Sequence, residues 1–168
     1  MSTMSNHIDI IVRITIAAPP SRCFDYIVPI ELSHIFQPYL LLPGVKRTDE
    51  AERWFTPGLA RTVYFTDDTK AKEELLTVES PHSFTYKISD FTGINKLLVS
   101  HINGAWQFSQ DSNGATNIEW TYSLACHNTA AQLLASVVVA PMLRRYLQRA
   151  LEIIQWDMIT KQQQEQGE

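Results

Sequence analysis

The sequence predicts an α+β fold in which a curved antiparallel sheet of about six or seven strands packs on one long C-terminal helix. Three observations support this fold class. The only long segment with helical periodicity is the last one, residues 129–161. Segments of alternating apolar and polar residues, separated by short turns, fill most of the chain from residue 45 to residue 126. Two short helical patterns lie between the first strand pattern and this region.

The C-terminal helix is predicted because its apolar residues recur at alternating steps of three and four, which places them on one face. This stripe consists of Leu133, Val137, Ala140, Leu147, Leu151, Ile154 and Met158. Pro141 has no backbone donor and crowds the carbonyl group four residues earlier, so we expect a kink or break ahead of a main helix of about 20 residues. The polar end of the chain, residues 162–168, is predicted to be disordered.

The first strand is predicted over residues 8–16, where isoleucine and valine occupy every second position. Pro19 and Pro20 end this strand. Two short helices are expected near residues 21–27 and 29–35. The run Leu40–Leu42 is too apolar for a fully solvated linker, and we expect it to lie over the core.

The rest of the sheet is predicted from strand patterns separated by turn residues such as Asp111-Ser112-Asn113-Gly114. The predicted strands are residues 45–55, 60–66, 70–79, 83–90, 97–109 and 116–126. Short loops between neighbouring strands indicate antiparallel pairing. Because no linker interrupts these patterns, residues 1–161 are predicted to form a single domain.

Composition and charge argue against several classes of protein. A net charge of −4 does not provide the basic surface that nucleic-acid binding requires. The sequence has neither an export signal at its beginning nor an apolar run long enough to cross a bilayer, so we expect a cytoplasmic protein with no integral membrane segment. Cys23 and Cys126 lie in apolar surroundings without a CxxC spacing and are predicted to be buried free thiols.

The order of the predicted elements is that of the helix-grip fold, in which a curved sheet grips the last helix around an interior cavity. The segment ITIAAPPSRCFDYI, residues 14–27, resembles the opening of the SRPBCC superfamily. This superfamily contains START lipid-transfer domains, the birch-pollen allergen family and polyketide cyclase/dehydrase-like proteins. Further segments resemble successive blocks of the polyketide cyclase/dehydrase-like branch: PGLARTV with Glu74, PHSFTYKISDFTG, GAWQF, GATNIEWTYSL and RRYLQRALEII.

The resemblance implies an interior cavity for an apolar or partly aromatic ligand, but it does not name a reaction, because this fold hosts many functions. Oxygenase members carry a mononuclear iron site and an additional iron–sulfur domain, for which this chain has no room. That branch is excluded.

The cavity is expected to be lined by the inward-facing residues of the strands, which alternate along each strand. The candidate ligand-binding residues are Phe65, Leu76, Phe84, Tyr86, Trp106, Phe108, Trp120 and Tyr122. The aromatic residues in this list also have a simpler interpretation, as residues that only pack in the hydrophobic core.

Three titratable residues are candidates for catalysis. Arg61 and Glu74 flank a hairpin turn whose register could pair them across the sheet, with Glu73 facing outward. This pair could orient a polar ligand group or form a plain cross-strand salt bridge. His34 lies on the second short helix and could transfer protons near the cavity, or it could be a surface residue.

The five histidines have no metal-ligand spacing, so no metal or cofactor is predicted. Three functions remain open. The first is binding or transport of a hydrophobic or aromatic small molecule. The second is a cyclase or dehydratase that uses general acid–base chemistry. The third is a homodimeric interaction module with contacts through residues 133–141.

Overall fold

Seven antiparallel strands form one sheet in the order β1-β7-β6-β5-β4-β3-β2 in the computed structural model, which describes residues 5–49 and 54–167. The strands are β1 His7–Ile16, β2 Val45–Thr48, β3 Ala60–Phe65, β4 Lys70–Glu79, β5 Ser83–Ser89, β6 Val99–Gln110 and β7 Thr116–Cys126. Except for the β1–β7 pair, neighbours in the sheet are neighbours in sequence, as short loops require.

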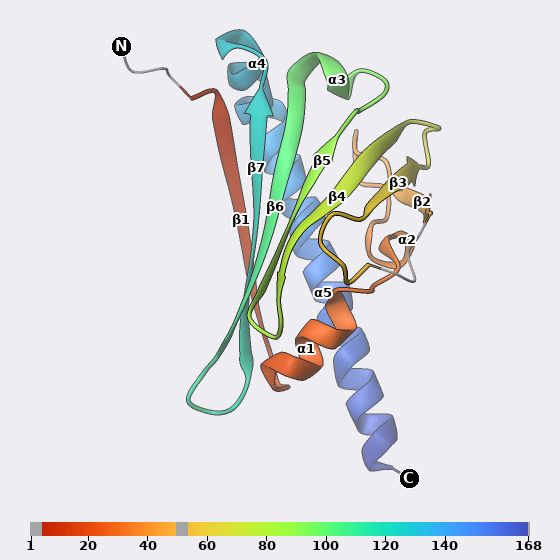
Figure 1. Cartoon of the computed structure of the whole chain (residues 1–168), viewed down its shortest axis with the longest axis vertical. Helices are drawn as coiled ribbons and strands as arrows, with labels where there is room; N and C mark the ends of the chain where they lie inside the picture. The colour runs from red at the N-terminus through yellow and green to blue at the C-terminus, as the bar shows by residue number, and fades with distance from the viewer. Residues whose placement is uncertain (1–4, 50–53, 168) are drawn as a thin grey trace.

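The helices cover one face of this sheet and its ends. They are α1 Pro20–Ile27, α2 Leu32–Ile35, α3 Asn95–Leu98, α4 Thr129–Leu134, the π-helical turn η2 Ala135–Val139 and α5 Ala140–Gln166. Figure 1 shows the sheet curving around α5, with α3 and α4 together at one end and α1 toward the other. This arrangement confirms the predicted α+β helix-grip fold, including the two short helices after the first strand.

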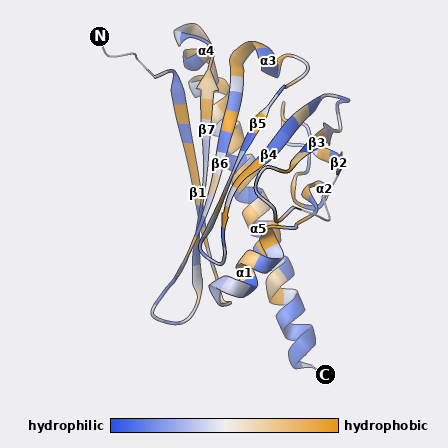
Figure 2. Cartoon of the chain, in the orientation of Figure 1, coloured by the Kyte–Doolittle hydropathy of each residue, from blue (hydrophilic) through white to orange (hydrophobic). Residues whose placement is uncertain are grey.

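The C-terminal helix differs from its prediction at both ends. Before Pro141 the chain forms the π-turn η2, in which the amide of Ala140 bonds to the carbonyl of Ala135. This wider turn accommodates a proline ring without breaking the helix. The tail predicted to be disordered from residue 162 is instead helical to Gln166, although its last turns are hydrophilic (Figure 2). An ion pair of 2.6 Å between Arg22 and Glu165 holds these last turns to α1.

Two strand boundaries were also predicted wrongly. The strand predicted for residues 45–55 ends at Thr48 in the structure; residues 50–53 lie outside the described residues, and Trp54 lies in a turn. Leu97, predicted to begin a strand, lies in α3 instead. The prediction that Cys23 and Cys126 are buried free thiols is confirmed.

The edge strand β1 is bound by side chains from α5 that reach its free carbonyl groups. Donors from α5 lie 2.8–3.4 Å from the carbonyl oxygens of three alternate β1 residues and of Ala17, which directly follows the strand. The pairs are Arg144 with Ile11, Gln148 with Arg13, Gln155 with Thr15, and Gln162 with Ala17. These bonds occupy acceptors that an exposed sheet edge would offer to another chain. They also explain why an arginine, Arg144, occupies a position of the apolar stripe between Ala140 and Leu147.

The core of the sheet is a stack of aromatic side chains around Tyr86. The rings of Trp106 and Trp120 stack with centroids 4.2 Å apart. Their indole N–H groups donate to the Tyr86 hydroxyl oxygen at 3.4 and 2.9 Å. Phe24 of α1 packs edge-on against Phe108, with ring centroids 5.4 Å apart, and closes this end of the core.

Gly104 makes room for the Tyr86 ring, which lies directly against it. A Cβ atom at position 104 would lie 2.3 Å from Cζ of Tyr86. Because two indoles fix the hydroxyl group, the ring cannot move away easily. We therefore expect Gly104→Ala to lower the free energy of unfolding by about 1–3 kcal/mol in urea titrations. Asn103→Ala, at the exposed neighbouring position, is the control; similar midpoints for both variants would contradict this account.

Candidate functional site

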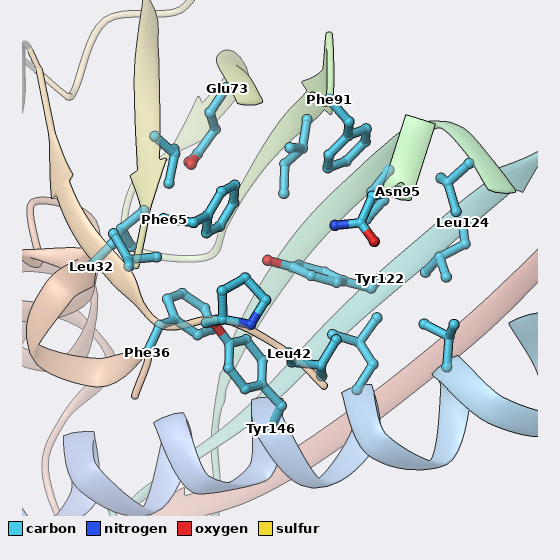
Figure 3. A pocket seen from close by; sticks show the side chains of 18 of the residues that line it. Leu32, Phe36, Leu42, Phe65, Glu73, Phe91, Asn95, Tyr122, Leu124 and Tyr146 are labelled. Carbon is cyan, nitrogen blue, oxygen red and sulfur yellow. The ribbon is translucent and has the colours of Figure 1, made fainter. Parts of the chain in front are cut away.

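A partly open cavity of about 130 Å³ lies between α5 and the concave face of the sheet (Figure 3). Its walls come from α2 and the following loop, from strands β2 to β7, from the segment around α3, and from η2 and α5. The apolar lining residues are Leu32, Phe36, Leu42, Pro43, Val45, Val63, Phe65, Ile88, Phe91, Leu98, Val99, Ile102, Leu124, Val139 and Leu143. Such a lining suits an apolar ligand.

Four polar side chains also line the cavity: Glu73, Asn95, Tyr122 and Tyr146. The hydroxyl of Tyr146 is already engaged, because it donates to the carbonyl of Pro43 at 2.7 Å. Figure 3 shows the carboxylate of Glu73, the hydroxyl of Tyr122 and the amide of Asn95 directed into the cavity from different walls. Burial is the main reason why the pKa of Tyr122 is raised well above its usual value.

Glu73 is the one charged residue among the described residues that line the cavity. Its Oε1 accepts a hydrogen bond of 3.0 Å from Nη2 of Arg61, and the two side chains are only 6% and 2% exposed. The guanidinium of Arg61 lies 3.9 Å from the ring centroid of Trp54. Burial raises the pKa of Glu73, and the charge and hydrogen bond of Arg61 oppose this rise.

The prediction that Glu74 pairs with Arg61 is wrong, because Glu73 does so instead. The register of the β3–β4 hairpin is the cause, because it places Glu73 directly opposite Arg61 and Glu74 opposite Ala60. Glu74 therefore lies half-buried outside the cavity, whereas Glu73 points inward. Farther along β4, a β-bulge lies between Leu75 and Thr77, where the pairing with β5 shifts by one residue. Side chains change face across such a bulge.

The prediction that Leu76 lines the cavity is also wrong, because of the same bulge. Leu76 is 41% exposed and does not line the cavity, whereas Leu75 is fully buried. Of the other predicted ligand-binding residues, Phe65 and Tyr122 lie on the cavity wall. The remaining five are Phe84, Tyr86, Trp106, Phe108 and Trp120; they are buried in the aromatic core and do not line the cavity. The helix α1 fills the space beside them, because Phe24 packs on Phe84 and Phe108.

His34 is brought near neither Glu73 nor the cavity. Its side chain is 53% exposed, and Nε2 lies 2.6 Å from Oδ2 of Asp157 on α5. The hydroxyl of Tyr26 donates to the same oxygen at 3.0 Å. Burial and the charge of Asp157 raise the pKa of Tyr26 to about 12. This outer cluster ties α1 and α2 to α5, and the structure does not place His34 where it could transfer protons to a ligand in the cavity.

Sequence reasoning missed the loop and helix-end residues that form much of the cavity wall, such as Leu42, Leu98 and Val139. The apolar run Leu40–Leu42 was the available signal. Each of these wall residues lies beside exposed aliphatic neighbours in sequence: Leu40 and Leu41, Ile94 and Leu97, and Val137 and Val138. Exposed apolar residues of this kind on three separate segments are typical of a ligand-binding region.

A second hollow, of about 630 Å³, lies on the outer face of the sheet. Its walls include Arg13, Gln107 and Asn117, which are exposed polar residues on β1, β6 and β7. Most of its lining residues are polar, and a wide hollow of this kind buries little of an apolar ligand. The smaller interior cavity is therefore the better candidate site.

The family described as polyketide cyclase / dehydrase and lipid transport matches residues 7–155. The chain belongs to this family. The matched residues include every strand and most of α5, so the cavity described above lies inside the part of the chain that matches the family. No curated protein matches the chain in sequence.

Several solved structures share the fold of this family member at low sequence identity. Ara h 8.0201 has a TM-score of 0.64 at 13% identity, over 92% of this chain and 99% of that chain. Major latex-like protein 151 from Panax ginseng has a TM-score of 0.65 at 13% identity, over 90% and 97%. The di-domain ARO/CYC BexL of the BE-7585A biosynthetic pathway has a TM-score of 0.65 at 16% identity, over 92% of this chain and 50% of that chain.

Two further findings concern metals and membranes. Among residues 5–49 and 54–167, no group of three or more His, Cys, Asp or Glu side chains gathers in a way that could hold a metal ion. Within the same residues, no helix is long and apolar enough to cross a bilayer.

Proposed function

We propose that this protein binds a hydrophobic or aromatic small molecule in the interior cavity and carries or senses it. The observation that supports this function is the cavity wall, which is apolar apart from a few convergent polar groups. A cavity of similar size, about 150 Å³ and lined by aliphatic and aromatic residues, binds benzene in another protein. The cavity of about 130 Å³ therefore suits one aromatic ring or a short aliphatic segment, with the rest of a longer ligand toward the exposed apolar residues.

Ligand binding should raise the melting temperature, because a ligand that binds only the folded state stabilises it. The expected gain is about 2.7 kcal/mol at a ligand concentration 100 times the dissociation constant. Ethylbenzene is a suitable probe for thermal unfolding, since it presents one ring and no polar group. Native mass spectrometry of protein purified from its own host would identify a retained ligand.

A variant that fills the cavity provides the control. Val63 lines the cavity, whereas its neighbour Thr62 faces away, so Val63→Phe should abolish the ethylbenzene shift and Thr62→Phe should retain it. A wild-type protein without any shift, or an equal shift in both variants, would show that the cavity is not the binding site.

A second candidate function is general acid–base catalysis on a ligand held in the same cavity. The observation in its favour is that a buried carboxyl with a raised pKa, Glu73, lines the cavity together with the hydroxyl of Tyr122. In this function Glu73 takes the place of the predicted Glu74. A reaction product formed from an added polyketide, and lost in Tyr122→Phe with binding retained, would favour catalysis over transport.

The homodimer predicted from residues 133–141 remains a proposal. Val137 and Val138 on η2 are 68% and 40% exposed, which leaves an apolar face open to a partner. The same native mass spectrum measures the oligomeric state. A monomer at micromolar concentration would exclude the dimer and leave these residues as part of the apolar surface near the cavity.

A further inference from the structure

Glu73 gives the apolar cavity a specific hydrogen-bond acceptor. The side chain is more than nine-tenths buried, lines the cavity, and has its carboxylate directed into it (Figure 3). Within the described part of the chain, its one hydrogen bond is the bond from Arg61 to Oε1. A carboxylate can accept about four hydrogen bonds. Glu73 therefore has acceptor capacity left for a ligand.

The negative charge of Glu73 is neutralised by Arg61, which does not line the cavity. Arg61, Val63 and Phe65 lie on the inward face of β3, yet only Val63 and Phe65 line the cavity. Arg61 lies farther from the cavity, between Glu73 and Trp54, where it donates to the carboxylate. Since the pair has no net charge, a charged ligand group beside it would introduce an uncompensated charge into an apolar cavity, at a large cost in desolvation.

The other walls offer no positive charge that could bind an anion. Among the described residues that line the cavity there is no lysine, arginine or histidine. Tyr146 is engaged with a backbone carbonyl, and Asn95 and Tyr122 are neutral. A carboxylate, as in an ionised fatty acid, would therefore lie beside Glu73 without any cation to neutralise it.

We propose that the buried end of the ligand carries a neutral hydroxyl group that donates a hydrogen bond to Glu73, and that the cavity selects against carboxylates. This inference rests on the proposed function and names the ligand class. A phenol-like group fits best, because the cavity accommodates one ring and the acceptor lies in its wall. Glu73 is then the residue that determines specificity.

Matched probes that differ only in one substituent test this inference. Isothermal titration at neutral pH would compare ethylbenzene, para-ethylphenol, its methyl ether and para-ethylbenzoate. We expect the phenol to bind about tenfold more tightly than ethylbenzene and the ether, because only the phenol can donate to a charged acceptor. The benzoate should bind at least about tenfold more weakly than the phenol. An ether that equals the phenol, or a benzoate that equals or exceeds it, would overturn the inference.

A double variant assigns the preference to Glu73. Arg61→Met with Glu73→Leu replaces the buried pair by apolar side chains of similar size, a change that proteins often tolerate. In this variant the phenol and ethylbenzene should bind equally well. A phenol preference that survives in the double variant would overturn the role of Glu73. If the wild-type protein binds ethylbenzene but shows no preference, only this inference fails; if it binds none of the four probes, the proposed function fails as well.

Discussion

Arg61→Met is expected to lower the free energy of unfolding by about 3–5 kcal/mol at neutral pH, since it leaves the carboxylate of Glu73 buried without its partner. The side chains of this pair are almost fully buried, so the lost hydrogen bond is not replaced by bulk water as it would be at the protein surface. Urea unfolding followed by tryptophan fluorescence measures the change. Replacing both residues, Arg61→Met with Glu73→Leu, should recover most of the loss, because no charge then remains buried.

The pair between Arg145 and Glu152 on α5 is the matched control. Its bond length is the same, 3.0 Å, but its side chains are 51% and 48% exposed. Arg145→Met should therefore cost less than about 1 kcal/mol. Equal losses for Arg61→Met and Arg145→Met would show that the Arg61–Glu73 pair does not behave as a buried pair.

The loss in Arg61→Met should also depend on pH. Burial raises the pKa of Glu73, and Arg61 lowers it, so removing Arg61 raises the folded-state pKa further. A carboxyl whose pKa is higher in the folded than in the unfolded state contributes stability that is present below the unfolded pKa. That stability is lost as the pH rises through the folded pKa. The destabilisation by Arg61→Met should therefore be smaller at about pH 5 than at about pH 8.

Leu151→Ala is expected to cost about 2–5 kcal/mol, because Leu151 is fully buried between α5 and the sheet. The loss combines the transfer free energy of the removed methyl groups with the cavity that remains. Its neighbour Glu152 is exposed, and Glu152→Ala should change stability by less than about 1 kcal/mol. Equal urea midpoints for these two variants would mean that a different face of α5 is buried.

The faces of most strands could be predicted because side chains alternate along an extended backbone. Trp106, Phe108, Trp120 and Tyr122 were assigned to the inward face on this basis, and all four are buried. The assignment failed at Glu74 and Leu76, which share one strand with a β-bulge. A bulge adds one residue to one strand, and the local residue pattern of β4 gives no sign of it.

The location of the cavity could not be predicted from alternation alone. Five inward aromatic residues pack against each other and against Phe24, so they fill the space that the alternation pattern left open for a ligand. The cavity remains instead where the wall includes loops and helix ends, such as Leu42 and Leu98. Which residues meet there depends on contacts between segments that are far apart in the sequence.

The sequence by itself determined the order of the elements, the antiparallel sheet and the buried stripe of α5, because these depend on periodicity and on turn residues within short segments. It also contained the short segments that resemble the family. Only the tertiary structure decided which acid faces the cavity. The choice between Glu73 and Glu74 depends on the register of the β3–β4 hairpin, which sets Glu73 opposite Arg61, while a bulge farther along β4 changes the face of the residues beyond it. Such a register is set by the packing of the whole sheet, because a shift of one residue exchanges the buried and exposed faces of a strand.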